Sequence, residues 1–128
     1  MKLDPIEFLV KYLDSIQEIP DGSVLGDLTN HVTGETAIYL EHMGGFRVVR
    51  DRMDRIDVEY AAYSLDRKEA VDLALLVREK FLEDLPDTAA SGALVLDVAE
   101  IDFPTYDPDD SSREHVYCGH VAVFYTAS

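Results

Sequence analysis

The chain has 128 residues, 47% of them hydrophobic, which predicts one domain, residues 1–128, with a buried core and excludes intrinsic disorder. Its 26 acidic and 11 basic residues give a net charge of −15, which disfavours binding to nucleic acid or anionic lipid. The sequence has no apolar run long enough to span a bilayer, no secretory signal in MKLDPIEF, and one cysteine, Cys118. We therefore expect a soluble protein of a reducing compartment.

The charges are distributed unevenly along the chain. Eight of the basic residues lie between Arg47 and Lys80, whereas Leu82 to Ser112 contains nine acids and no base. Segments of opposite sign could let one copy of the chain dock against another. The alternative is a solvated surface that keeps the protein soluble.

The first predicted helix lies in LDPIEFLVKYLDSI, residues 3–16. Asp4 is in the position of an N-cap, Pro5 suits the first helical residue, and Glu7 completes a capping box. Apolar residues recur on one face of this helix, as expected for a helix that packs on a core.

A second helix is predicted from the same cap signature in LDRKEA, with Asp66 as the N-cap and Glu69 three residues later. It should run to about Leu85, just before Pro86. One apolar sector of this helix comprises Ala70, Leu73, Ala74, Val77 and Phe81, and a second comprises Val71, Leu75 and Leu82, with Arg78 between the two sectors. That arc is wider than one sheet face requires, which predicts a further contact with the first helix or with another subunit.

Four other segments have the pattern of strands: residues 36–43, 55–63, 93–103 and 115–125. Gly44-Gly45 is expected to form a turn, and residues 104–113 a loop. Residues 17–35 are poorly patterned, with turns expected at Asp21-Gly22 and Thr33-Gly34. The fold class is therefore α+β: a mainly antiparallel (mixed) sheet of about four to five strands with two helices packed on one face.

The segment HVYCGH invites a metal interpretation. On a strand, Cys118 and His120 share a face while His115 points away, and His31 and His42 lie in unrelated segments, so four zinc ligands do not converge. Residues two apart on a strand are also too distant for a cysteine–histidine dyad. We expect no metal site and no nucleophile here.

Two further patterns fail as catalytic or cofactor motifs. DPDDSSREHVYC begins like a calcium loop but has Ser112 and Cys118 where the loop needs glycine and glutamate, which leaves an exposed acidic loop or at most a weak cation site. Asp54, Asp57 and Glu59 lie on the polar face of a strand, with no sign of desolvation. The sequence contains no nucleophile elbow, phosphate-binding loop or zincin motif, so we expect no cofactor and no catalytic residue.

The segment FRVVRDRMDR is the densest cluster of arginines. Arg47, Arg50, Arg52 and Arg55 alternate here with Asp51 and Asp54. Arginine favours charged interfaces because its planar guanidinium binds carboxylates in a bidentate manner. The arginines either pair locally with Asp51 and Asp54 or contact a neighbouring chain.

The order and character of these elements resemble the tail terminator (tail completion) proteins of long-tailed, siphovirus-type bacteriophages, most of all those of actinobacteriophages. The resemblance lies in RIDVEYAAYSLDRKEAVDLALLVREKFLEDL, where a strand passes directly into a capped helix. It continues in ALVLDVAEIDFPTYDPDDSSREHVYCGHVAVFYTAS and includes the opening LDPIEFLVKYL. Residues 17–45 show the least likeness.

The resemblance implies a virion structural protein, made in the host cytoplasm, that forms a ring, typically a hexamer, on the neck-proximal end of the tail tube. The ring stops tube polymerisation and offers a surface to the head–tail connector; its partners are its own copies, the major tail tube protein and the neck proteins, with DNA only as passing cargo. No catalytic residues are implied. Candidate subunit-interface residues are Arg47, Arg50, Arg52, Arg55 and Arg78, with Asp97, Glu100, Asp102, Asp107, Asp109 and Asp110 on the acidic side.

Other functions remain open on the sequence. Another neck or head–tail connector ring protein would share the ring and differ only in its neighbours. An acidic DNA mimic would suit the net charge but not the basic cluster. A small hydrolase or isomerase ranks lowest, because no nucleophile and base can be named.

Overall fold

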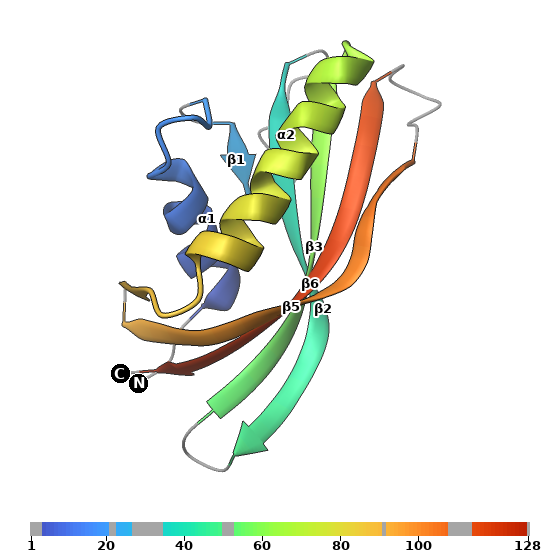
Figure 1. Cartoon of the computed structure of the whole chain (residues 1–128). Coiled ribbons are helices and arrows are strands. Elements are labelled where there is room, and N and C mark those ends of the chain that lie inside the picture. The colour runs from blue at the N-terminus through green and yellow to red at the C-terminus, as the bar shows by residue number, and fades with distance from the viewer. Residues whose placement is uncertain are drawn as a thin grey trace.

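The fold is built on one curved sheet with both helices in front of the same face, as a computed structural model of the chain shows (Figure 1). The structure describes residues 4–20, 23–26, 35–49, 53–90, 92–107 and 114–127. The helices are α1 (Pro5–Asp14) and α2 (Arg67–Glu79), and a π-helical turn, η1 (Lys80–Asp84), continues α2. The strands are β1 (Val24–Leu25), β2 (Ala37–Val49), β3 (Met53–Ser64), β4 (Ala89–Ala90), β5 (Ala93–Tyr106) and β6 (His115–Ala127). This confirms the predicted α+β class and the two helices on one face.

The strands of the sheet lie in the order β1-β2-β3-β6-β5-β4. The pairs β2–β3, β3–β6, β5–β6 and β4–β5 are antiparallel, and only β1 pairs in parallel, with β2. Four strands are 12 to 14 residues long, whereas β1 and β4 have two residues each. The two short strands lie at opposite edges of the sheet.

Both helices begin at the predicted caps. The Asp4 carboxylate accepts hydrogen bonds from the amides of Ile6 and Glu7, and Asp66 caps α2 through the amide of Lys68. These bonds satisfy amides that have no partner inside the helix. Helical backbone extends to Asp84, close to the predicted end of the second helix at Leu85.

The core lies between the sheet and the two helices. Along β3, the side chains that face the helices are buried at every second position, Ile56, Val58, Tyr60 and Ala62. The first apolar sector predicted for α2 is buried against them. Phe81 meets the Tyr60 ring edge-on, with centroids 5.8 Å apart, and stacks near Tyr12 of α1 at 6.4 Å. These aromatic contacts join both helices to the middle of the sheet.

Two expectations about the strands were wrong or incomplete. Gly44-Gly45 is not a turn: β2 runs through it to Val49, with register shifts between His42 and Gly44 and again after Arg47. A pair of glycines permits a β-bulge as readily as a turn, and here the long β3 partner continues the ladder past it. The strands β1 and β4 were not predicted, and β5 continues to Tyr106, three residues into the segment 104–113 that was expected to be a loop. The expected turns at residues 21–22 and 33–34 lie outside the described residues.

Within the described residues, neither helix is long and apolar enough to cross a membrane.

Candidate functional site

The two edges of the sheet are the most distinctive surfaces of the described structure. β1 covers β2 only at Ile38 and Tyr39, and β4 covers β5 only at Ala93 and Leu94. In the described part of the chain, no strand pairs with the outer edge of β2 over residues 41–49, or with that of β5 over residues 96–106. Open edges of this length present rows of backbone N–H and C=O groups that can pair with another chain.

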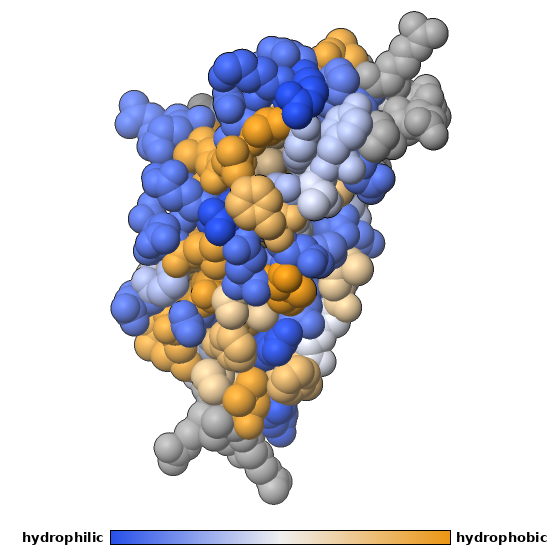
Figure 2. All heavy atoms as spheres, turned by 45° about the vertical axis from the view of Figure 1, so that its right-hand side comes forward, coloured by the Kyte–Doolittle hydropathy of each residue, from blue (hydrophilic) through white to orange (hydrophobic). Residues whose placement is uncertain are grey.

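The β5 margin combines exposed apolar side chains with carboxylates. Each of its large exposed side chains exposes at least 40% of its surface: Leu96, Ile101, Phe103 and Tyr106. Figure 2, which turns this side of the molecule toward the reader, shows hydrophobic side chains reaching the surface among hydrophilic ones. Asp97, Glu100 and Asp102 belong to the same strand, and residues 93–106 contain no Lys or Arg. We call this surface the acidic margin.

Arg78 of α2 lies beside the acidic margin. Its guanidinium binds Glu100 through two bonds, of 2.5 and 3.0 Å, and sits over the Phe103 ring, 4.8 Å from the centroid. This hydrogen bonding holds the pKa of Glu100 below its ordinary value and raises that of Arg78. The contacts tie α2 to β5, so Arg78 and Glu100 are partners within one chain. Of the second apolar sector of α2, Leu75 remains 37% exposed beside them.

The opposite margin is the hairpin of β2 and β3, which extends beyond the helices in Figure 1. Met43, Phe46 and Val48 are each more than 40% exposed, and Arg47 lies between the last two. In the sequence, residues 47–55 contain four Arg and two Asp, of which the structure describes Arg47, Asp54 and Arg55. We call this surface the arginine hairpin.

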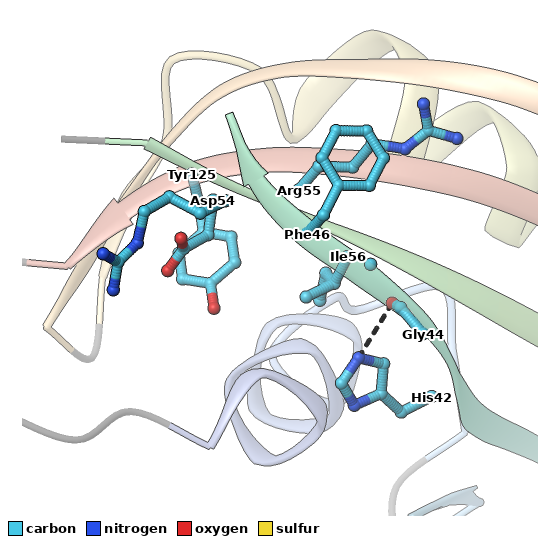
Figure 3. Close-up of a pocket in the computed structure, with 9 residues that line it drawn as sticks. His42, Gly44, Phe46, Asp54, Arg55, Ile56 and Tyr125 are labelled. Atoms are coloured by element: carbon cyan, nitrogen blue, oxygen red, sulfur yellow. Dashed lines mark hydrogen bonds between the residues drawn. The ribbon is translucent and has the colours of Figure 1, made fainter. Parts of the chain in front are cut away.

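A shallow groove of about 340 Å³ lies along the arginine hairpin (Figure 3). His42 Nε2 lies 2.9 Å from the carbonyl oxygen of Gly44, and Figure 3 shows Ile56 and Tyr125 on the side of the strands toward α1. Phe46 and Arg55 lie on the other side. The groove is open, and the groups that line it do not converge on one point, so it does not resemble a catalytic pocket.

Arg55 is held by contacts within its own chain. Its Nε lies 2.8 Å from the Asp57 carboxylate, and its guanidinium lies 5.3 Å from the ring centroid of Phe46 and 5.8 Å from that of Phe124. The local pairing that the sequence left open therefore occurs for Arg55, with Asp57 as the partner. Of the other predicted interface residues, Arg50, Arg52, Asp109 and Asp110 lie outside the described residues, and Asp107 follows the end of β5.

The helix-free face of the sheet contains the one histidine that ion-pairs across strands in the described structure. His120 Nε2 lies 3.0 Å from the Glu59 carboxylate and Nδ1 lies 3.2 Å from that of Asp102, which links β3, β6 and β5. Nδ1 makes no well-aligned hydrogen bond. The imidazole thus lies between carboxylates of the two strands that flank β6.

Cys118 lies near this histidine on the same face. Burial, together with Glu59 and Asp107, raises the pKa of its thiol to about 12, so the nucleophilic thiolate is scarce at neutral pH. Among the described residues, no cluster of His, Cys, Asp and Glu side chains is arranged to hold a metal ion.

Sequence reasoning found the charged segments but missed the open edges. No local signal shows that β1 and β4 stop after two residues, because their pairing depends on distant segments. The apolar residues of β5 gave a hint, because Leu96 directly follows Val95, and Ile101 and Phe103 are out of phase with Val98.

No protein-family model matches the chain, and a search of curated proteins finds no significant relative.

Proposed function

We propose that the protein is a structural ring component of a bacteriophage tail, a tail terminator that caps the tail tube and receives the head–tail connector. One observation carries the proposal: the acidic margin and the arginine hairpin lie at opposite edges of one sheet. A ring requires a heterologous contact in which one patch meets a different patch on the next copy. The resemblance of the element order to tail terminators supplies the particular role.

The described chemistry supports a mechanical role. The thiol of Cys118 is protonated at neutral pH, the groove on the hairpin is open, and the large exposed apolar side chains gather at the two edges. Exposed apolar groups flanked by charge are typical of surfaces that bind protein. A net charge of −15 also lets DNA pass the ring without being retained, because it offers few counterion-releasing contacts.

The test is charge reversal at the arginine hairpin. We expect Arg47→Glu to weaken ring assembly about tenfold or more, because an attractive pair at the contact becomes repulsive. Assembly is measured by sedimentation velocity and by negative-stain microscopy, with purified tail tubes present and absent.

Lys68→Glu is the matched control. It changes the net charge by the same amount, but Lys68 lies on α2 and pairs with Asp72 at an exposed site, away from both edges. Rings that form equally well in the Arg47→Glu variant and in the control would reject the proposed contact. A wild-type chain that stays monomeric even beside tail tubes would reject the ring function itself.

A further inference from the structure

The open edges of β2 and β5 are the surfaces through which one copy of the chain could pair with the next. We propose that neighbouring copies pair strand to strand, the β2 edge over residues 41–49 of one copy aligning antiparallel with the β5 edge over residues 96–106 of the next. This inference rests on the proposed ring function and names the surface and the partner: a second copy of this chain, held by backbone hydrogen bonds that extend the sheet.

Strand direction supports this pairing. The pairs β2–β3, β3–β6 and β6–β5 are all antiparallel, so β2 and β5 run in opposite directions. A rotation that carries one copy to the next around a ring, about an axis along the strands, keeps these directions. It therefore sets β5 of one copy antiparallel to β2 of its neighbour, a pairing that is slightly more stable per residue than the parallel one.

The register across the sheet indicates which residues would meet. Phe46 pairs with Arg55, Arg55 with Phe124, and Phe124 with Asp97, so Phe46 and Asp97 lie at the same height on opposite edges. Pairing without an offset then sets Phe46 opposite Asp97 of the next copy, on the helix-free face, whereas Arg47, the next residue of β2, points to the other face of the sheet. The same register sets Glu41 level with Asp102, a like-charged pair, through Glu59 and His120.

Charge distinguishes this partner from the alternative two-fold contacts. Pairing β5 with β5 would bring Asp97 and Asp102 of two copies to one seam, and pairing β2 with β2 would bring two Arg47 side chains to one seam. Like charges that face each other across strands are destabilising. Pairing with the other edge of the same sheet avoids these two contacts and sets exposed apolar side chains of one edge, such as Phe46, along those of the other, such as Leu96.

Hydrogen exchange of backbone amides tests the pairing directly. We expect the amides of residues 41–49 and 96–106 to exchange about tenfold or more slowly in the assembled ring than in the unassembled Arg47→Glu variant, because edge amides become hydrogen-bonded. Protection that appears in only one of the two segments, or in neither while rings still form, would overturn the strand pairing and leave the ring function intact. A chain that forms no ring with tail tubes would overturn both.

A second variant checks the same edge without touching the arginines. Leu96 is 40% exposed, so Leu96→Lys should leave the fold intact, but it places a cation at the height of Phe46 and Arg47 of the next copy. We expect it to weaken assembly about tenfold or more, whereas Leu65→Lys, at a 58% exposed position between β3 and α2, should not. Equal assembly of the two variants would contradict the inference.

Discussion

Two tyrosines of the core, Tyr12 and Tyr60, differ in whether the side-chain hydroxyl has a hydrogen-bond partner. The hydroxyl of Tyr12 donates a hydrogen bond of 2.8 Å to the carbonyl of Lys80, which fastens α1 to η1. The Tyr60 hydroxyl is buried and has no hydrogen-bond partner among the described residues. Gly119 lies opposite Tyr60, and a Cβ there would come within 2.4 Å of the ring, so the glycine makes room for the tyrosine.

This contrast predicts opposite effects of one substitution. Tyr12→Phe should lower the free energy of unfolding by about 0.5–1.5 kcal/mol, because it removes a made hydrogen bond and leaves a carbonyl with one partner fewer. Tyr60→Phe should be neutral or stabilising, because it removes a desolvated hydroxyl without breaking a bond. Urea unfolding of both variants beside the wild type measures the difference, and an equal loss in both would show that Tyr60 does have a partner.

At the scale of the element, sequence predicted what local chemistry determines. Asp4 and Asp66 fixed the starts of both helices because a cap depends on a few consecutive residues. The alternation in residues 55–63 predicted β3 because its partners cover one face. The continuation of β2 beyond Gly45 was not predictable, because it depends on β3, a separate segment that holds the ladder together past the bulge.

The bulge in β2 yields a prediction about its two glycines. Both have positive φ, of 125° at Gly44 and 147° at Gly45, but a Cβ at Gly45 would lie 2.1 Å from the carbonyl oxygen of Arg55, whereas nothing lies within 4 Å at Gly44. Gly45→Ala should therefore be less stable than Gly44→Ala by roughly 1–3 kcal/mol, since only Gly45 adds a backbone clash to the conformational strain.

Thermal or urea unfolding of the two alanine variants measures this difference, and Gly44→Ala serves as the control for strain alone. Two variants of equal stability would mean that the hairpin shifts freely to accommodate a methyl group. In that case the arginine hairpin would be a less rigid docking surface than the structure indicates.

At the scale of the whole molecule, electrostatics acts in two opposing ways. Each copy carries a net charge of −15, so copies repel one another at long range, whereas the proposed contact would bring opposite charges together at short range. Single exposed ion pairs contribute about 0–1 kcal/mol, which is small beside the repulsion between whole molecules of this charge.

Added salt should therefore strengthen assembly. We expect the wild type to associate more tightly at about 0.3 M than at about 0.02 M NaCl, because the Debye length falls well below the size of the molecule and net repulsion is screened first. Sedimentation velocity over this range measures it. Association that weakens steadily with salt would show instead that local ion pairs dominate the contact.

The sequence predicted the two charged segments but not which of their charged side chains form ion pairs within the chain. The acids of residues 82–112 and the arginines of residues 47–55 were visible as segments. The ion pair between Arg78 and Glu100 was not visible in the sequence, because it depends on where α2 crosses β5. Since these two residues pair within one chain, neither is free to pair with a neighbouring copy. Which charges remain unengaged is a property of the packing.

The two-residue strands β1 and β4 have a mechanical consequence for any neighbouring copy. β1 blocks the edge of β2 at the end level with Tyr106, and β4 blocks the edge of β5 at the end nearest Val49. A strand that docks along either edge therefore meets a stop at one end and cannot slide past it. The two short strands would therefore limit the register in which a neighbouring strand can dock, whichever side chains then meet across the contact.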